Sequence, residues 1–350
     1  MADNIYYDGT KLLNMRDING DRPEIYIVDG NRSSGKTTYF YRYLVNRFLK
    51  FGEKFALIYR FQNELKGCSD QFFGNIGPLF FPGHDCTEEK RQEGAFYELY
   101  IDNNSAGYAI ALNNPDKIKK LSHFFIDVQR MYFDEFQGLR YTPDEVAHLI
   151  SLHTSIARAP NKPVRYVPVY MSSNHISSLN PYYKAFHVAG KIDSMREGYY
   201  KGDGFVIEKN MNDEVANLQK QSPFLRAFSS SDEVRHTIEN ISSLDNYGFI
   251  EKIKTSNFEY LCNIKVDDEM ISLKAPRDVK GVRFYFDRAY DPNMKERFAI
   301  DTSGHSDDTI LIGGSSVFIM KVKQEFERGR VRFADLETKE KAFEFLMLTW

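Results

Sequence analysis

The residues from Gly30 to Thr37 have the types and spacing that a phosphate-binding loop requires. They read GNRSSGKT and match the pattern G-x-x-x-x-G-K-[ST] at every defined position. Glycines let successive main-chain N–H groups point at phosphate oxygens, and a following helix adds its positive N-terminal end. We expect Lys36 to reach the β- and γ-phosphates of ATP and the Thr37 hydroxyl to bind Mg²⁺. The predicted nucleotide contacts are Gly30, Arg32, Ser33, Ser34, Gly35, Lys36, Thr37 and Thr38.

Two adjacent acids end another apolar segment, YFDEF. Asp134 is placed to hold Mg²⁺, directly or through water, as acids at strand ends do in P-loop enzymes. Glu135 extends to the other side of the strand tip, where it could orient and deprotonate the attacking water. An apolar–Asp–Glu sequence alone is a common strand exit. Combined with the upstream loop, it favours an ATPase that performs work over a small-molecule kinase.

Polar residues end a third apolar segment, VYMSSN, and its last residue, Asn174, is a candidate sensor of the γ-phosphate. Spacing alone favours an ordinary strand-ending asparagine there. The run ERGRVRF at 327–333 could contact nucleic-acid phosphates, although a solvated surface is the more common explanation. Several basic residues could serve a phosphate bound by a neighbouring subunit, and the sequence does not choose between Arg60, Lys119, Lys120, Arg158 and Arg165.

These side chains need strands that end at one edge of a sheet. The apolar run EIYIV predicts a strand before the loop, and the spacing of three and four from Lys36 predicts a helix that stops near Gly52. The segment TPDEVAHLISLHTSIAR predicts a helix with Thr142 as N-cap and Pro143 at its first position. Alternating patterns predict further strands at 55–60, 130–136 and 164–174, and a hairpin at 96–112.

Strands that alternate with helices indicate an α/β fold with a mostly parallel sheet covered on both faces. We expect this ATPase domain to span residues 1–205, with residues 66–94 rich in loops. Residues 206–245 are polar and read as a linker or small helical subdomain. Residues 246–350 combine alternating segments with later helical ones and predict an α+β C-terminal domain.

Composition narrows the functional classes. The 350 residues carry a net charge of −3, which excludes a uniformly basic DNA-coating protein but allows a basic lining on one surface. The three cysteines are scattered without a CxxC pair, which fits a reducing, intracellular setting and not a structural zinc site. The sequence shows no secretory signal and no apolar run long enough to span a membrane.

The combination of motifs resembles the DNA-packaging (encapsidation) ATPases of small short-tailed phages, whose motor includes a phage-encoded RNA ring. The matching segments are GNRSSGKT, NRFLKFGEKF with IYRFQNEL, AGYAIAL, FDEF, YTPDEVAHLISL with Arg158 beyond it, and SSN followed by NPYY. Weaker similarity continues through PFLRAF, FIEKIK and RVRF. The resemblance covers nearly the whole chain and is strongest between residues 25 and 185.

The resemblance implies a ring of identical subunits, a pentamer, with a nucleotide at each interface. Arg158 matches the arginine finger that one subunit donates to its neighbour's site. Lys120, or Lys119 beside it, lies near a second position of this trans-acting kind. Asn174 matches the sensor position, whereas Gln62 stands where the family has a lysine after the second strand.

The resemblance also implies the partners: double-stranded DNA, the capsid portal and a packaging RNA, with no membrane, in the host cytoplasm and at the viral prohead. It assigns the first domain to the P-loop group with an additional strand and a catalytic glutamate. The C-terminal domain would resemble a ribonuclease-H-like nuclease that has lost its metal-binding acids. The available acids, which no spacing singles out as a set, are Asp267, Asp268, Asp287 and Asp301.

Two alternatives remain open at the level of the sequence. One is a large terminase subunit whose nuclease works, so that it cuts DNA as well as pumping it. The other is a binding or assembly module that ATP only switches, with slow hydrolysis. The adjacent acids at 134 and 135 speak against the second alternative, because a switch does not require a base for water.

Overall fold

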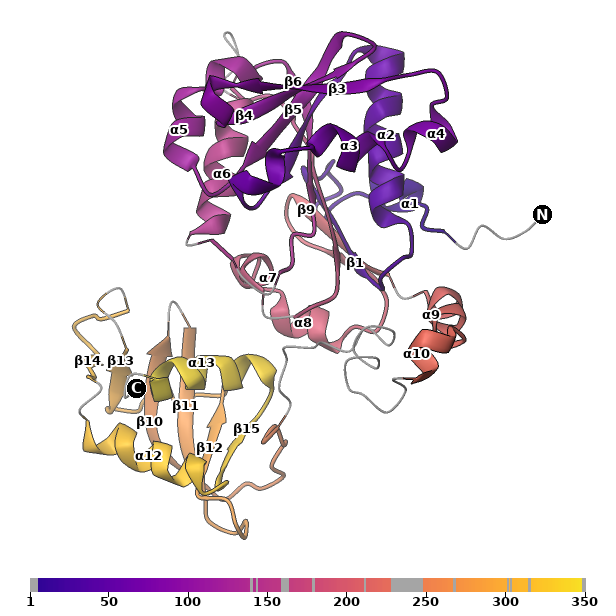
Figure 1. Ribbon diagram of the computed structural model, residues 1–350. Coiled ribbons are helices and arrows are strands. Elements are labelled where there is room, and N and C mark those ends of the chain that lie inside the picture. Colours follow the sequence, from indigo (N-terminus) through magenta and orange to yellow (C-terminus); the bar gives the residue numbers. More distant parts are fainter. Residues whose placement is uncertain are drawn as a thin grey trace. The chain divides into compact units, whose positions relative to one another are not determined.

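The computed structural model describes residues 6–138, 141–142, 144–158, 164–177, 180–210, 212–227, 248–266, 269–300, 302, 304–313 and 316–347. The chain divides into two compact units, Met1–Leu244 and Asp245–Trp350, and each has its own hydrophobic core (Figure 1). Among the described residues, no helix is both long and apolar enough to cross a membrane.

The first unit is built on a nine-stranded sheet with the order β3-β4-β5-β2-β6-β7-β1-β9-β8. The strands from β5 to β9 in this order pair in parallel, and the flanking β3, β4 and β8 are antiparallel to their neighbours. The bounds are β1 Ile25–Gly30, β2 Lys54–Tyr59, β3 Cys86–Arg91, β4 Phe96–Ile101, β5 Asn104–Ala111, β6 Val128–Asp134, β7 Val169–Asn174, β8 Gly198–Lys201 and β9 Phe205–Asn210.

Helices cover both faces of this sheet, as expected (Figure 1). Along β1, Ile27 packs in the cluster that contains α6 side chains, whereas Tyr26 and Val28 pack with those of α2, because successive strand residues point to opposite faces. The helices are α1 Thr10–Leu13, α2 Lys36–Phe51, α3 Cys68–Phe73, α4 Gly77–Phe80, α5 Pro115–Lys120, α6 Glu145–Ile156, α7 Pro181–Ala185, α8 Ala189–Ser194, α9 Asp213–Lys220 and α10 Pro223–Ala227.

Several predicted elements differ from the structure. The segment 66–94 is not mainly loop, because it contains α3, α4 and the edge strand β3. The strand predicted from residue 164 begins only at Val169. The strand β9 pairs with β1, so the expected boundary at residue 205 would cut through the sheet. The helices α9 and α10 follow β9, within the region expected to be a linker or helical subdomain.

The ends of two predicted helices show what local sequence determines. The helix α2 ends as expected, because Gly52 adopts the left-handed conformation at φ 68° and its N–H bonds to the carbonyl of Phe48. The helix α6 does not begin with Thr142 as its cap; Asp144 occupies that position and Glu145 is the first helical residue. Thr142 instead donates hydrogen bonds to the Glu145 carboxylate. Pro143 lies outside the described residues.

The second unit contains a six-stranded mixed sheet with the order β14-β13-β10-β11-β12-β15. The strands are β10 Phe258–Val266, β11 Glu269–Pro276, β12 Phe284–Asp287, β13 Arg297–Ala299, β14 Ile310–Leu311 and β15 Val331–Phe333, and the helices are α12 Val317–Glu327 and α13 Leu336–Met347. Strands β10, β11 and β12 are antiparallel, and β13, β14 and β15 add in parallel. This α+β arrangement agrees with the alternating and helical patterns of the sequence.

Candidate functional site

Two glycines determine the path of the loop between β1 and α2. A Cβ atom at Gly30 would lie only 2.1 Å from the carbonyl oxygen of Asn210, because β9 runs directly alongside β1. Gly35 has φ 92°, in the left-handed region, and precedes the first residue of α2. Glycine has no side chain that could cap this helix, so the first N–H groups of α2 remain available to an anion.

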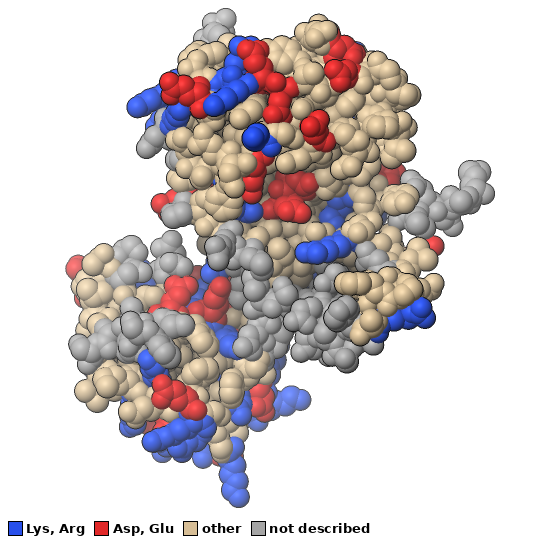
Figure 2. All heavy atoms as spheres, viewed as in Figure 1, with Lys and Arg blue, Asp and Glu red and all other residues tan. Residues whose placement is uncertain are grey.

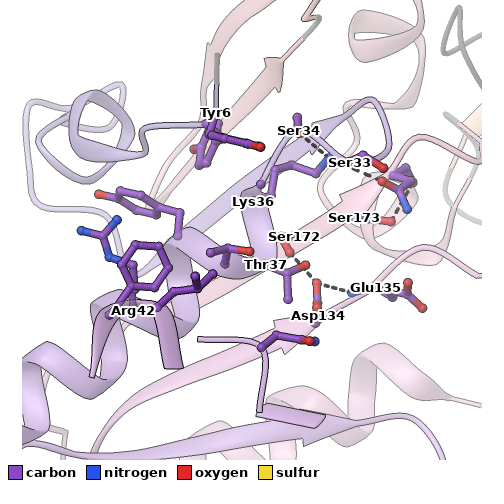
Figure 3. Close-up of a pocket in the computed structure, with 18 residues that line it drawn as sticks. Tyr6, Ser33, Ser34, Lys36, Thr37, Arg42, Asp134, Glu135, Ser172 and Ser173 are labelled. Carbon is purple, nitrogen blue, oxygen red and sulfur yellow. Dashed lines mark hydrogen bonds between the residues drawn. The ribbon is translucent and has the colours of Figure 1, made fainter. Parts of the chain in front are cut away.

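The loop forms one wall of a cavity of about 780 Å³ at the carboxyl ends of the parallel strands (Figure 3). Open α/β sheets bind ligands at this edge. The cavity is lined by Tyr6, Tyr7, Ser33, Ser34, Gly35, Lys36, Thr37, Thr38, Tyr39, Arg42, Asn75, Leu79, Phe80, Asp134, Glu135, Ser172, Ser173 and Asn174.

Lys36 is buried within the loop. Its ammonium group donates hydrogen bonds to the main-chain oxygen of Asn31 at 2.6 Å and to Ser34 Oγ at 3.2 Å, and it lies 3.5 Å from Asn174 Oδ1. Burial lowers the pKa of Lys36 to about 8, although the charges of Asp29 and Asp134 oppose the shift. An anionic ligand beside this ammonium would favour its charged form.

Asp134 ends β6, and its side chain lies next to that of Thr37 in the cavity (Figure 3). Its Oδ1 atom accepts a hydrogen bond from Ser172 Oγ at 2.6 Å and one from the Glu135 N–H at 3.0 Å. Ser172 is paired with Asp134 across β6 and β7, and its hydroxyl also contacts the Tyr132 hydroxyl at 2.7 Å. These contacts fix the orientation of the Asp134 carboxylate.

Glu135 follows β6 with φ 50°, a left-handed backbone conformation that residues other than glycine rarely adopt. The turn directs its carboxylate away from the strand (Figure 3). Partial burial and the adjacent Asp134 charge raise the pKa of Glu135, while Arg32 and Arg60 act in the opposite direction. A raised pKa with ready access to the cavity suits a group that accepts a proton from water.

Asn174 reaches the same cavity because β7 lies between β6 and β1. The register pairs Asn174 with Gly30, the first residue of the loop, and it pairs Ser172 with Asp134. The structure therefore brings together the residues expected to bind phosphate, hold a metal, activate water and sense the γ-phosphate. The residues come from three segments that are far apart in the chain, so local sequence patterns do not show that they meet.

Four of the predicted site residues do not line the cavity. Gly30 ends β1 and begins the loop, and Arg32 is exposed, with a charge that lowers the pKa of Glu135. Arg158 is exposed just beyond the last turn of α6. Lys120 is exposed at the end of α5, which packs against α6 (Figure 1). These two cations are thus on neighbouring helices and outside their own chain's cavity.

Two of the other basic candidates have internal roles. Arg60 is buried against Glu145 with an Nε–Oε2 distance of 2.9 Å, so it is not exposed for a neighbouring subunit. Arg165 donates to the carbonyl oxygen of Ile156 at 2.9 Å, at the end of α6. Gln62 also bonds internally, from its Nε2 to the Gly94 carbonyl oxygen at 2.7 Å.

The basic run near the C-terminus is accompanied by acids. Arg328 and Arg330 form ion pairs with Glu325, and Arg332 pairs with Glu251. Figure 2 shows the same mixing of Lys and Arg with Asp and Glu on the visible face of each unit. These pairs favour the explanation of a solvated, charge-balanced surface for 327–333.

The acids considered for a nuclease site do not form one in the described part of the chain. Asp287 pairs with the buried Lys274, with an Nζ–Oδ2 distance of 2.8 Å, so a protein cation already neutralises it. Asp267, Asp268 and Asp301 lie outside the described residues. No cluster of three or more His, Cys, Asp or Glu side chains with metal-binding geometry occurs among those that are described.

The cavity is also lined by residues that the sequence did not predict, namely Tyr6, Arg42, Asn75, Leu79 and Phe80. Figure 3 shows Tyr6 and Arg42 on the side opposite Asp134 and Glu135. These residues come from the N-terminal segment, α2 and the region of α3 and α4, and no motif joins them. Of these residues, only Arg42 could have been connected with the site from the sequence, because it lies six residues beyond Lys36 on the same predicted helix.

A parallel-rich sheet, a strand–loop–helix unit around Lys36 and an acid pair on a neighbouring strand define the P-loop class of nucleotide-binding proteins. Comparison with known proteins then gives the family. The sequence model described as "Podovirus DNA encapsidation protein (Gp16)" matches residues 1–349, and the chain belongs to this family. Its function is viral genome packaging, as the resemblance in the sequence indicated.

Individual relatives agree with the family. The DNA packaging proteins of Bacillus phages PZA and phi29 are each 26% identical to this chain over 350 residues, which is 98% of either chain. The solved bacteriophage Phi-29 viral genome packaging motor assembly gives a TM-score of 0.71 at 23% identity, covering 99% of this chain and 100% of that one. The Phi-28 gp11 DNA packaging motor gives 0.59 at 15% identity, with 99% and 98% covered. These two structures establish the likeness of fold.

Proposed function

We propose that this protein is the ring-forming ATPase of a phage packaging motor and translocates double-stranded DNA into a preformed capsid. The observation that carries the proposal is the convergence of Lys36, Asp134, Glu135 and Asn174 on one cavity at the carboxyl edge of the sheet. ATP fits this site because the loop N–H groups, the start of α2 and Lys36 all favour the triphosphate.

The same site fits Mg²⁺. A hydroxyl from Thr37 and a carboxylate from Asp134 face the cavity together, and Mg²⁺ prefers hard oxygen ligands of these kinds. When bound, the ion would neutralise charge on the β- and γ-phosphates. Ser172 supports this role, because its hydrogen bond to Oδ1 orients the Asp134 carboxylate.

Hydrolysis would use the remaining residues of the site. Glu135 accepts a proton from the attacking water, which its position beside Asp134 and its raised pKa support. Asn174 contacts the γ-phosphate or the water, and Lys36 moves from its loop contacts to the phosphate oxygens. Each of these roles uses a side chain that already lines the cavity.

The outward position of Arg158 supports a finger that acts in trans. Because it lies outside its own cavity, it can complete the site of the next subunit, with Lys120 nearby on α5. Arginine fingers are worth about 10³- to 10⁵-fold in rate. By the family resemblance of the sequence, the assembly would be a pentameric ring that contacts the portal and a packaging RNA in the host cytoplasm.

The C-terminal unit would be a vestigial ribonuclease-H-like domain that contacts nucleic acid or the portal. Its mixed sheet with helices supports the likeness, and the Lys274–Asp287 pair supports the loss of metal-dependent cleavage. Cleavage of plasmid DNA by the full-length protein with Mg²⁺ or Mn²⁺ would instead favour a terminase with a working nuclease.

Mixing two inactive subunits tests the trans site. Arg158→Ala subunits keep their own phosphate loop, and Lys36→Ala subunits keep their finger. If sites are completed between subunits, a mixture recovers part of the DNA-stimulated ATPase activity that neither variant shows alone. No recovery at any mixing ratio, with both variants folded and assembled, would contradict the trans finger.

A further inference from the structure

Arg60 occupies a position that neither the phosphate loop nor the finger explains. It follows β2, and its guanidinium donates to the Phe136 carbonyl oxygen at 2.7 Å and to the Glu135 carbonyl oxygen at 3.3 Å. Its Nε donates to Glu145 Oε2 at 2.9 Å. One side chain thereby joins the turn of the proposed general base to the first residue of α6.

The Glu145 end of this contact is equally well satisfied. The Tyr182 hydroxyl donates to its Oε1 at 2.8 Å, and the Thr142 N–H donates to its Oε2 at 3.0 Å. Glu145 is 2% exposed and Arg60 is 8% exposed. Every polar group at the centre of the cluster therefore has a partner inside the protein.

Stability alone is a weak reason for such a cluster. Removing two charges from water costs several kcal/mol per ion, and well-packed apolar residues often replace buried ion pairs without loss. The contacts to two successive carbonyl groups point to a different purpose. They hold the peptide of Glu135 in its left-handed turn at φ 50°, a conformation that costs of order 1–3 kcal/mol when unsupported.

The helix α6 extends this connection to the other catalytic position. It begins at Glu145 and ends at Ile156, and Arg158 follows two residues later. Its buried side chains Leu149, Leu152 and Ile156 pack in one core cluster with Phe133 of β6, so the helix is fixed to the strand that carries the acids. A shift of the Glu135 turn would therefore be transmitted through Arg60 to the N-terminal end of this helix.

We propose that Arg60 is a positioning residue that ties the water-activating turn at Glu135 to the helix bearing Arg158. Each subunit's own base and the finger that it gives to its neighbour would then move as one unit. This inference rests on the proposed function, because it assigns a regulation to that same site. It gives a physical route by which the state of one site reaches the next.

A second consequence concerns turnover in the subunit's own site. Arg60 holds the peptide of Glu135 but is not among the residues that line the nucleotide cavity. Loss of the guanidinium should therefore lower kcat for ATP and leave KM for ATP nearly unchanged, a separation that general loss of structure would not produce.

The test uses the paired change Arg60→Met with Glu145→Gln, because it removes both charges and keeps one amide oxygen as an acceptor for either Tyr182 or Thr142. The matched control is Arg130→Met with Glu53→Gln. In that pair Arg130 is buried and Glu53 half-buried, with an Nε–Oε2 distance of 2.6 Å, but the pair lies toward the start of β6 and does not line the cavity. Denaturation midpoints and ATP affinity are measured for both double variants.

The paired change is then placed in subunits that also carry Lys36→Ala, which can act only as finger donors, and these are mixed with Arg158→Ala subunits. We expect the recovered ATPase activity to be at least about tenfold lower than with donors that carry Lys36→Ala alone. Donors that carry Lys36→Ala and the control pair should recover nearly as much activity as donors with Lys36→Ala alone. In otherwise wild-type rings, kcat for ATP should fall while KM for ATP stays nearly unchanged.

Equal recovery from donors with and without the paired change would overturn the connection to Arg158, and an unchanged kcat would overturn the positioning of Glu135. A fall of the same size with the control pair would also count against the inference. If simple mixing of Lys36→Ala with Arg158→Ala gives no recovery, the trans-site proposal fails instead, and the kcat and KM values still test Arg60.

Discussion

The Nδ1 atom of His175 lies 2.7 Å from Oδ2 of Asp29, and both side chains are buried. Asp29 immediately precedes Gly30 of the phosphate loop, and His175 immediately follows Asn174. The Tyr183 hydroxyl donates to the same Asp29 oxygen at 3.0 Å. This contact therefore connects the phosphate loop with the strand end that carries the proposed sensor.

Replacing Asp29 with Asn should destabilise the protein by about 3–5 kcal/mol, because it leaves the buried His175 without its charged partner. Chemical denaturation at neutral pH measures the change. The control Tyr183→Phe removes only the hydroxyl and should cost about 1 kcal/mol. A smaller loss for Asp29→Asn than for this control would contradict the importance of the pair.

The pH dependence of this contribution has a definite sign. Burial alone would raise the pKa of Asp29, but the charge of His175 and its hydrogen bond lower it overall. The stabilisation is thus complete above the unfolded value near 3.9 and is lost as the pH falls through the lower folded value. Denaturation curves of the wild type and Asp29→Asn should converge only in strong acid.

The turnover number for ATP should increase with pH through an apparent pKa above the usual glutamate value. Burial and Asp134 raise the pKa of Glu135, and only its deprotonated form accepts a proton. Glu135→Gln should bind ATP and lose about 10²- to 10⁴-fold in turnover. Full turnover by this variant, in steady-state assays with saturating DNA, would exclude Glu135 as the base.

ATP binding at pH 9 should take up about one proton, because Lys36, with a pKa of about 8, is mostly neutral there and triphosphate restores its charge. Calorimetry in buffers of different ionisation enthalpy measures the uptake. The Lys36→Met variant should bind ATP more weakly and take up fewer protons. Identical proton uptake by the wild type and this variant would show that Lys36 does not meet the phosphates.

The base of the nucleotide should stack at the aromatic end of the cavity. The Arg42 guanidinium lies 4.2 Å from the centre of the Phe80 ring, and Tyr6, which packs against Gly35, is 60% exposed. Stacking of a base on an aromatic ring is worth about 1–3 kcal/mol, so Tyr6→Ala should weaken ATP binding roughly 5- to 150-fold. Competition by inorganic tripolyphosphate, which has no base, should be unchanged; an equal loss for both ligands would contradict the stacking.

The local sequence was sufficient to predict the structure wherever interactions between neighbouring residues determine it. The phosphate loop, the helix that follows it and the glycine that ends that helix depend on backbone conformations and short-range hydrogen bonds, which residue types restrict directly. The two acids at the end of β6 were identified for the same reason. The short α3 and α4 were missed, because helices of four to six residues owe their stability to packing and not to propensity.

The sequence by itself determined that this chain has a phosphate loop, an acid pair and the family to which they belong. Only the tertiary structure decided which distant side chains share the cavity and that Arg60, one of five basic candidates, lies buried between Glu135 and Glu145. The register of β6, β7 and β1 controls these contacts. That register results from burial of whole sheet faces, which no single segment encodes.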